Sequence, residues 1–592
     1  MDKPRYSVLF YFLSRYKPLC WAILLLTLVS SALESLSVAA FFPLFSSLMG
    51  SSQKEVKGIL SFIARMGKVL PFSDPIVSAV VLLILIFTVK TLFSLLREGM
   101  ISYATGKVLY SVRKQLIEKY SGAQYQFFLD NKQGALLFNT MSAPQGVSTI
   151  LLNALQMVVY LLKVLAIGIV LGLIFPQVTL AFAGISLLFY GVMHYLSVRV
   201  TLRLGRGAAK AGAEQTVIAS EFLSGIQQII TFQATRRWVE RFDRENRALS
   251  EICTKQQMWF SMPRPVSELI GAVLILGSIL VLRVVSTDNF VEVLAKLGIF
   301  AVALTQVLPA VTAVGRSRMM IMVALPTAEL AYHAITETVP RRKDGHRVLE
   351  FFEKAIAFEN VSFAHKGRDA LLKGVNLTIE KGKVTAIVGP SGAGKTTMIN
   401  LILGLFEPTE GRITIDGIPL QEFKQETWLS KIGPVSQDTF TYHSTIADNI
   451  LFGRNGHSME SLIKATKIAN AHGFISELPQ GYDTLVGERG MKLSGGQQQR
   501  LAIARAMLDA PEILIFDEAT SSLDSISEKL VQEAIDTVSS ERTVIIIAHR
   551  LSTIRHADKI IVLEGGQVVE EGSHQELVNR RGDYSRLVDS YR

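Results

Sequence analysis

A glycine-rich run, GPSGAGKTT at residues 389–397, has the residue types that bind phosphate. Four of its residues match the pattern G-x-x-x-x-G-K-[ST]: Gly389, Gly394, Lys395 and Thr396. Glycines let backbone N–H groups turn inward around phosphate oxygens, and the helix predicted to start near Lys395 adds the positive end of its dipole. We expect Lys395 to reach the β- and γ-phosphates of a nucleotide and Thr396 to bind Mg²⁺. An apolar strand before the run and an apolar helix after it argue against a chance glycine turn.

Two adjacent acids follow a second apolar strand, in EILIFDEATSSLD at 512–524. Asp517 is expected to hold Mg²⁺ through its water shell, and Glu518 to polarise the attacking water. The alternative is a solvated strand end. An unbroken apolar run that leads into paired acids, in a chain with a phosphate loop, favours the catalytic interpretation.

A third apolar strand, in TVIIIAHRLST at 543–553, leads into His549. A lone histidine is more often structural than catalytic. This one follows the carboxyl end of a predicted strand, where open α/β sheets bind ligands. We therefore predict that His549 contacts the γ-phosphate and the catalytic water.

A second glycine-rich run, LSGGQQQR at 493–500, has no lysine and no acid. Ser494 and Gln497 have the spacing of a capping box, and Pro511 lies beyond the end of the helix that follows. The run is either the start of a well-capped helix or a second anion site made of bare amides at a helix N-terminus. The residues alone do not choose between these two readings.

The elements that must position these residues occupy only the second part of a chain of 592 residues. Apolar residues make up 49% of the sequence and are concentrated before position 330, where we predict membrane helices of roughly 20 residues each. Six spans are predicted: 18–49, 75–97, 149–174, 176–198, 262–285 and 293–315. The fold class is therefore a membrane α-helical domain, with long cytoplasmic extensions, followed by an α/β ATPase domain.

The charges of the loops predict the orientation of these helices. Both long polar stretches, 98–148 and 199–261, are rich in Arg and Lys and are read as cytoplasmic, whereas 286–292 carries only acids and is read as external. The sequence therefore divides into three parts: a transmembrane domain at 1–335, a linker at 336–350 and a nucleotide-binding domain at 351–592. The basic N-terminus runs into a long apolar stretch, which we interpret as uncleaved.

Net charge and cysteine content argue against a nucleic-acid-binding protein and against a disulfide-rich or zinc-binding protein. The charge of +10 flanks apolar segments, as in a membrane protein, and does not gather as in a nucleic-acid binder, so no nucleic acid is expected as a partner. Cys20 and Cys253 lie far apart, so neither a disulfide framework nor a zinc site is predicted.

The ordered combination of phosphate loop, LSGGQ, FDEATSSLD and AHR resembles the nucleotide-binding domain of ABC transporters. With six helices in front, nearly the whole chain resembles a type IV, exporter-type ABC half-transporter. The resemblance implies ATP and Mg²⁺ as cofactors and a second copy of the chain as partner. It also implies that LSGGQ of one copy closes over the ATP held by the phosphate loop of the other.

The resemblance assigns further residues one by one. Gln437 matches a glutamine that senses Mg²⁺ and water, Asp524 an acid that communicates between the two sites, and Glu488 a loop that touches the partner's cytoplasmic helices. Glu518, His549 and Gln437 are the expected catalytic residues. The expected metal ligands are Thr396, Gln437 and Asp517. The expected nucleotide contacts are Gly389, Ser391, Gly392, Gly394, Lys395, Thr396, Thr397, His365, Ser494, Gly495, Gly496, Gln497 and Asp524.

One position departs from the family pattern. The run VSFAH places His365 where the family has a tyrosine that stacks on adenine. A histidine ring can stack as well, and the alternative is a plain surface residue. Two short runs, 125–134 and 220–229, resemble the family's coupling helices, although an ordinary amphipathic helix would explain them nearly as well.

Three ionisable residues fall inside predicted membrane spans: Glu34, Lys90 and Lys163. Such groups are costly in a membrane and usually face a cavity or a partner, although either lysine could extend its side chain to the membrane surface. A cavity with exposed lysines would favour an amphiphile that carries a phosphate or a carboxylate.

These patterns predict an ATP-driven exporter or flippase that works as a homodimer by alternating access and moves an amphipathic substrate, a lipid or lipid-linked molecule being favoured. We expect a multi-pass protein of the plasma membrane, in a bacterium the inner membrane, with its nucleotide-binding domain in the cytoplasm. A peptide or multidrug exporter is the alternative. A membrane ATPase that regulates or gates a channel without pumping is a further one.

Overall fold

The computed structural model describes residues 11, 14–41, 44, 71–72, 74–174, 176–285, 290–436, 439–487, 490–517, 525–539, 542–547 and 554–590. The chain divides into two compact units. The first comprises Met1–Ala123 and Phe127–Pro340, and the second comprises Gln124–Gln126 and Arg341–Arg592.

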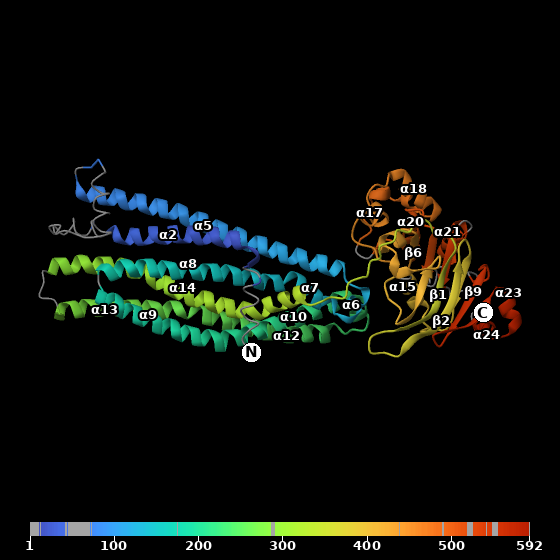
Figure 1. Ribbon diagram of the computed structural model, residues 1–592, viewed down its shortest axis with the longest axis horizontal. Helices are drawn as coiled ribbons and strands as arrows, with labels where there is room; N and C mark the ends of the chain where they lie inside the picture. Colours follow the sequence, from blue (N-terminus) through green and yellow to red (C-terminus); the bar gives the residue numbers. More distant parts are fainter. Residues whose placement is uncertain are drawn as a thin grey trace. The chain divides into compact units, whose positions relative to one another are not determined.

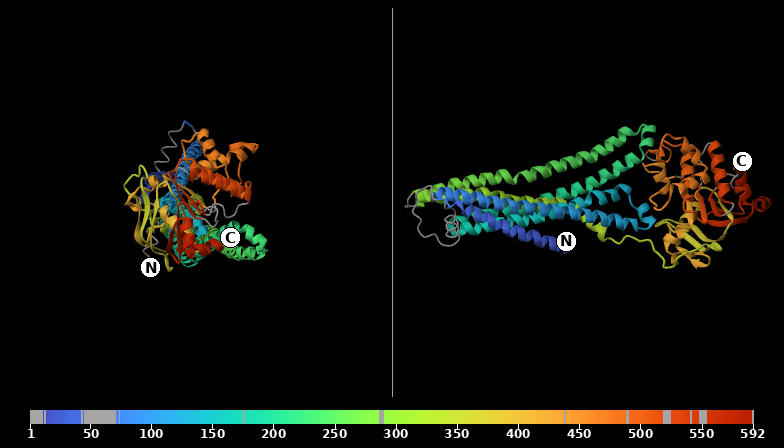
Figure 2. Two further views of the ribbon diagram at one scale, coloured as in Figure 1. Left: turned by 90° about the vertical axis from the view of Figure 1, so that its right-hand side faces the viewer. Right: turned by 90° about the horizontal axis from the view of Figure 1, so that it is seen from above.

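In its described part, the first unit consists of helices. They are α2 (Lys17–Ala39), α5 (Pro75–Ser121), α6 (Tyr125–Asp130, which starts in the second unit), α7 (Gln133–Met141), α8 (Ala143–Ile174), α9 (Pro176–Leu196), α10 (Leu202–Ser224), α11 (Ile226–Thr231), α12 (Thr235–Ser261), α13 (Pro263–Val285) and α14 (Phe290–Thr336). A π-helical turn at Ser197–Thr201 joins α9 to α10. The long helices run side by side, as α8 and α14 do in Figure 1, and Figure 2 shows the same helices from two other sides.

Each of the six predicted spans overlaps one helix, namely α2, α5, α8, α9, α13 or α14. Among the described residues, five helical stretches are long and apolar enough to cross a membrane: Lys17–Ala39, Ile76–Ser121, Gln133–Leu173, Thr235–Gly277 and Phe300–Thr336. Helix α8 ends at Ile174 and α9 begins at Pro176, and the one residue between them lies outside the described residues. Part of the first predicted span, within 42–49, lies outside the described residues.

Two helices continue far beyond their predicted membrane spans, as long cytoplasmic extensions require. Both α5 and α14 have 47 residues, which at 1.5 Å per residue gives about 70 Å, more than twice the roughly 30 Å of a bilayer core. Hydropathy identifies only the apolar part of such a helix. The polar stretch that starts at 98 therefore continues α5 as far as Ser121, before the chain reaches the short helix α6.

The described part of the second unit contains two sheets. The strands are β1 (Ala355–Ala364), β2 (Ala370–Glu380), β3 (Val384–Val388), β4 (Glu410–Ile415), β5 (Ile418–Pro419), β6 (Ile432–Val435), β7 (Ile513–Asp517), β8 (Thr543–Ile547), β9 (Lys559–Glu564) and β10 (Gln567–Gly572). One sheet is antiparallel, in the order β2-β1-β4-β5. The other has the order β10-β9-β3-β8-β7-β6 and is parallel from β9 to β6.

The helices of this unit are α15 (Lys395–Ile402), α16 (Gln425–Leu429), α17 (Ile446–Leu451), α18 (Met459–Ile468), α19 (His472–Glu477), α20 (Gly495–Met507), α21 (Ser525–Ser539), α23 (His574–Arg580) and α24 (Asp583–Ser590). Because neighbouring side chains of a strand point to opposite faces, each central strand contributes to two cores. In β3, Ala386 and Val388 belong to one core and Ile387 to the other. This alternation decides where each functional helix lies.

Candidate functional site

The phosphate loop connects β3 to α15, as the sequence predicts. The Lys395 side chain is only 6% exposed and folds back into the loop, where its Nζ donates hydrogen bonds to the carbonyl oxygens of Gly389 (2.8 Å) and Pro390 (3.0 Å). Ser391, Gly392 and Thr396 are exposed, whereas Thr397 is buried. A buried cation beside exposed amides and a hydroxyl provides donors for phosphate and an oxygen ligand for Mg²⁺, so the residues fit both groups.

Two glycines of this loop have conformations or surroundings that other residues would strain. Gly394, at the N-cap of α15, has φ +101°, and a Cβ there would lie 2.7 Å from Leu372 Cδ2. A Cβ on Gly389 would lie 2.1 Å from the carbonyl oxygen of Leu563. The pattern of glycines therefore reflects backbone geometry and close packing, both of which other side chains would disturb.

Asp517 is the last residue of β7 and half-buried. Strands β3, β8, β7 and β6 are parallel, so Asp517 and the phosphate loop lie at the same, carboxyl edge of the sheet. Glu518 follows Asp517 directly, but lies outside the described residues, as do Gln437, Glu488, Asp524 and His549. Their assignments stay predictions.

The second glycine-rich run begins α20 with a capping box, as predicted. Ser494 Oγ accepts a hydrogen bond from the Gln497 amide (3.2 Å), and Gln497 Oε1 accepts one from the Ser494 amide (2.9 Å). Ser494 and Gly495 are exposed and Gly496 is buried. The amides of the first helical positions point out of the helix end, so α20 has the polarity that binds anions.

The helices that follow the two glycine-rich runs lie on opposite faces of the parallel sheet. Helix α15 contributes Met398 and Leu401 to the core that contains Ile387, whereas α20 contributes Leu501 and Ile503 to the core that contains Ala386 and Val388. The N-termini of α15 and α20 therefore start on different faces of the six-stranded sheet.

His365 follows β1 and is half-buried among aromatic rings. Its ring contacts the edges of Phe363 (5.0 Å between centroids) and Phe406 (5.5 Å), and its Nδ1 lies 3.4 Å from Gln126 Oε1. These contacts hold the ring in place, and its stacking on adenine stays a prediction.

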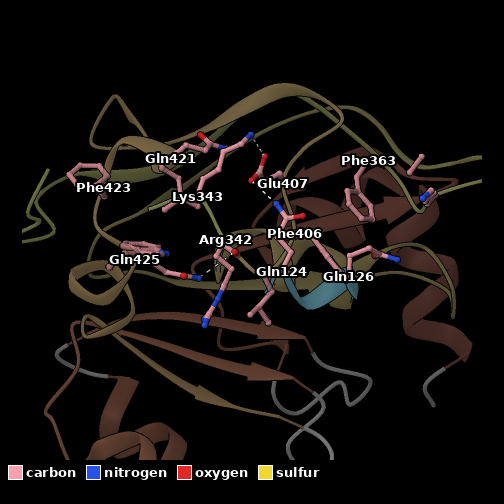
Figure 3. Close-up of a pocket in the computed structure, with 16 residues that line it drawn as sticks. Gln124, Gln126, Arg342, Lys343, Phe363, Phe406, Glu407, Gln421, Phe423 and Gln425 are labelled. Carbon is pink, nitrogen blue, oxygen red and sulfur yellow. Dashed lines mark hydrogen bonds and ion pairs between the residues drawn. The ribbon is translucent and has the colours of Figure 1, made fainter. Parts of the chain in front are cut away.

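A pocket of about 310 Å³ lies in the second unit, beside the stacked rings of Phe363 and Phe406 (Figure 3). Its lining includes Lys343 and Gln124, which both bind the carboxylate of Glu407, at 2.7 and 3.2 Å. The pocket thus has polar residues in its lining and lies next to Phe363 and Phe406, the two rings that contact His365. Sequence analysis did not identify these residues, because they come from four separate parts of the chain.

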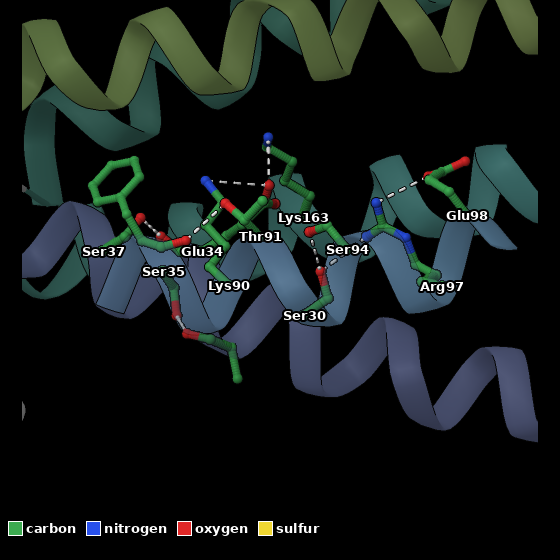
Figure 4. Close-up of polar contacts among 12 residues, drawn as sticks. Ser30, Glu34, Ser35, Ser37, Lys90, Thr91, Ser94, Arg97, Glu98 and Lys163 are labelled. Atoms are coloured by element: carbon green, nitrogen blue, oxygen red, sulfur yellow. Dashed lines mark hydrogen bonds and ion pairs between the residues drawn. The ribbon is translucent and has the colours of Figure 1, made fainter. Parts of the chain in front are cut away.

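The three ionisable residues of the predicted membrane spans form one cluster in the first unit (Figure 4). Glu34 Oε1 lies 2.8 Å from Lys163 Nζ and 3.6 Å from Lys90 Nζ. The side chains are 9%, 19% and 16% exposed, in that order. The expected partner is therefore present: Glu34 pairs with both lysines, whose side chains stay partly exposed.

Further polar residues of α2 and α5 extend this cluster and were missed by sequence analysis. Arg97 Nη1 donates to Ser30 Oγ (3.0 Å), which lies 3.3 Å from Ser94 Oγ. The sequence carries a signal for them, because buried polar residues recur along α2 every three or four positions: Thr27, Ser30, Ser31, Glu34 and Ser37.

Comparison with known proteins supports these observations over the whole chain. Sequence models described as the ABC transporter transmembrane region and the ABC transporter match residues 18–306 and 372–521. The heterocyst differentiation ATP-binding protein HepA of Nostoc sp. is 36% identical over 80% of this chain and 77% of its own length. A Staphylococcus aureus ATP-binding/permease protein, named for multidrug export, is 34% identical over 83% of this chain and 85% of its own.

A solved structure agrees with these relatives. A bacterial Atm1-family ABC exporter with ATP bound superposes with a TM-score of 0.80 at 26% identity and covers 98% of each chain. The fold, the loops at the carboxyl edge of the sheet and these relatives lead to one assignment. The chain belongs to the ABC transporter family, as an exporter-type half-transporter of the membrane that uses ATP and Mg²⁺ and couples ATP hydrolysis to transport.

Proposed function

We propose that two copies of the chain form a homodimer with two ATP sites, each built from the phosphate loop of one copy and the LSGGQ run of the other. The position of α15 and α20 on opposite faces of one sheet carries this proposal. Helix N-termini on different faces of a sheet are better placed to bind two separate ATP molecules than to bind one ATP together. A second copy supplies the missing half of each site.

In each site the residues have separate tasks. Lys395 and the loop amides hold the β- and γ-phosphates, while Thr396, Asp517 and Gln437 hold Mg²⁺. When bound, Mg²⁺ neutralises charge on the phosphate oxygens. Glu518 polarises the attacking water, and His549 orients it against the γ-phosphate. The remaining expected contacts, His365 on adenine and Asp524 between the sites, complete the assembly.

We further propose an amphipathic substrate, with a lipid or lipid-linked molecule favoured, that leaves the cytoplasm or the inner leaflet. Two features of the first unit support this proposal. Residues of α8, α9 and α14 line an apolar pocket of about 590 Å³, whose polar groups include Thr179, Ser186 and Tyr190. The charged cluster around Glu34 lies on another face of α8, so apolar and charged surfaces are both present, as an amphiphile requires. The membrane is then the plasma membrane, in a bacterium the inner membrane.

A drug exporter is the second candidate, favoured by the name of the Staphylococcus aureus relative. Mass spectrometry of molecules that co-purify with the nucleotide-free protein separates the two. An enriched lipid or lipid-linked glycan supports the first candidate, and a small hydrophobic compound supports the second.

The catalytic proposal predicts the behaviour of Glu518→Gln. An amide cannot take a proton from water, so hydrolysis should fall at least about a hundredfold, the lower end of the range for general-base catalysis. ATP binding should remain, and the dimer should stay closed with ATP trapped. Retained nucleotide per dimer and phosphate release measure the two effects.

Glu533→Gln is the matched control, because Glu533 is an exposed acid on α21. It should hydrolyse ATP like the unmodified protein. Normal turnover in Glu518→Gln would refute the catalytic role. Reconstituted vesicles test pumping itself: ATP-dependent movement of the co-purified molecule against its gradient supports an exporter, and movement only down the gradient supports a gated channel.

A further inference from the structure

The polar cluster in the membrane helices carries more positive than negative charge. Among the described residues, Lys90, Lys163 and Arg97 supply three cations, and two carboxylates, Glu34 and Glu98, pair with them. The Glu98 side chain is 49% exposed and neutralises Arg97 from outside the cluster, at 3.1 Å. An unbalanced cation in a low-dielectric surrounding is costly, so such clusters usually mark the place of an anionic ligand.

The cluster lies along one line of contact between α2 and α5. Lys90, Ser94 and Arg97 are spaced by four and three residues, so they share one face of α5 over roughly 10 Å. Ser30 and Glu34 form the facing row on α2, and Lys163 reaches Glu34 from α8. Figure 4 shows these side chains converging from three helices.

Two buried polar atoms of this cluster, Arg97 Nε and Ser31 Oγ, have no hydrogen-bond partner among the described residues. The side chain of Arg97 is buried, with the residue 9% exposed, and the neighbouring Ser31 is buried as well. Buried polar atoms are normally satisfied, so an unpaired guanidinium N–H in a cationic cluster indicates a missing acceptor.

Glu34 binds both lysines through the same oxygen atom, Oε1. The Lys90 contact is the longer one, at 3.6 Å against 2.8 Å for Lys163. Both lysine side chains keep some exposure, 16% and 19%, so another anion can reach them. Glu34 thus has the position of an internal counter-ion that an incoming anion can replace.

We propose that Lys90, Lys163 and Arg97 form a binding site for the phosphate headgroup of an anionic membrane lipid, and that Glu34 holds the lysines in place until the headgroup arrives. The proposal rests on the proposed lipid export and adds the chemical class of the substrate. Phosphate offers several acceptor oxygens, which suits two ammonium groups and a guanidinium better than a single carboxylate does.

The experiment measures lipid binding to the full chain without nucleotide, so it does not depend on transport. The delipidated protein is titrated with phosphatidylglycerol and, separately, with diacylglycerol of the same acyl chains, which lacks the phosphate, and bound lipid is counted by native mass spectrometry. Phosphatidylglycerol should bind about tenfold more tightly, the scale of a buried charge contact. Equal affinities would overturn the site.

Variants test whether the preference for phosphatidylglycerol depends on the residues of the cluster. Lys163→Gln and Arg97→Gln should each remove most of it. Glu34→Gln should increase it, because the internal competitor for the lysines is gone. Arg236→Gln, on the exposed face of α12, where the side chain is 93% exposed, should leave it unchanged. Misfolding cannot raise a specific preference, so the opposite sign of Glu34→Gln separates binding from structural damage, and a decrease in that variant contradicts the proposal.

Inorganic phosphate distinguishes a lipid from a soluble anion. It should displace phosphatidylglycerol no better than sodium chloride at equal ionic strength, and stronger displacement would reject the lipid as the source. If the lipid preference holds while vesicle transport fails, the export proposal fails and the binding site stands. If transport succeeds without the preference, the binding site alone fails.

Discussion

Helices α15 and α20 both begin at glycine-rich runs, but their first turns are stabilised in different ways. The N-cap of α15 is Gly394, in a left-handed conformation and without a side-chain cap. The N-cap of α20 is Ser494, which forms a reciprocal capping box with Gln497. The start of α15 therefore has donors that a ligand can satisfy, whereas α20 satisfies two of its own.

The difference shows what the glycines are for. Gly394 has φ +101°, which an L-residue adopts only with strain. Gly495 and Gly496 lie inside the first turn of α20, where any residue with ordinary helical geometry is tolerated. The backbone conformation of this turn thus does not require glycine at either position. The two glycines are explained if another molecule approaches the helix end closely, as the proposed shared site requires.

Mixed dimers provide the strongest test of this comparison. In a dimer of one Lys395→Ala copy and one Gly495→Asp copy, a shared arrangement puts both changes in one site and leaves the other intact. Each parent homodimer should lose ATP hydrolysis at least a hundredfold, as expected when a key phosphate contact is removed. The mixed dimer should trap one nucleotide, measured after rapid removal of free ATP.

The mixed-dimer experiment requires that Gly495→Asp leave α20 folded. An acid in the first turn stabilises a helix by about 0.3–1 kcal/mol, so Gly495→Asp should keep α20 folded while it repels phosphate. If each chain built its own site, both sites of the mixed dimer would carry one change. No trapped nucleotide in the mixed dimer would therefore contradict the shared site.

The sequence alone predicts much of this architecture, because contiguous runs encode it. The phosphate loop, the capping box at Ser494 and the strand that ends at Asp517 all lie within short stretches, and the structure places each of them as expected. The placement of α15 and α20 on opposite faces could not be predicted, because it depends on how alternate residues of β3 distribute between two cores.

The membrane cluster was only half predictable for a similar reason. Hydropathy identified Glu34, Lys90 and Lys163 as charges inside apolar helices. Their pairing depends on the rotation of α2, α5 and α8 about their axes, which no local pattern fixes. Hydropathy located the membrane spans of α5 and α14 but not the ends of these helices, because a helix can continue beyond the apolar residues that identify it.

Alanine at the two glycine positions gives a smaller but more direct test of the comparison. Gly394→Ala should lower the stability of the second unit by about 1–3 kcal/mol, because it forces a left-handed residue and crowds Leu372. Gly495→Ala should leave stability unchanged or slightly higher. Thermal unfolding without nucleotide measures both. Both variants should hydrolyse ATP poorly, and equal destabilisation would mean that Gly495 is a structural glycine.

The smallest expected effect separates a helix cap from an anion site. Ser494→Ala removes the cap at a cost of about 1 kcal/mol, so the first amides of α20 should exchange with solvent roughly fivefold faster. Ser573 forms a second capping box, with Glu576 at the start of α23, and Ser573→Ala should cause similar fraying there. Hydrogen exchange of the two helices measures both effects. ATP hydrolysis should fall only in Ser494→Ala, because the proposed site uses that hydroxyl for the partner's γ-phosphate. If the two variants lose the same cap and both keep full activity, Ser494 is a helix cap and nothing more.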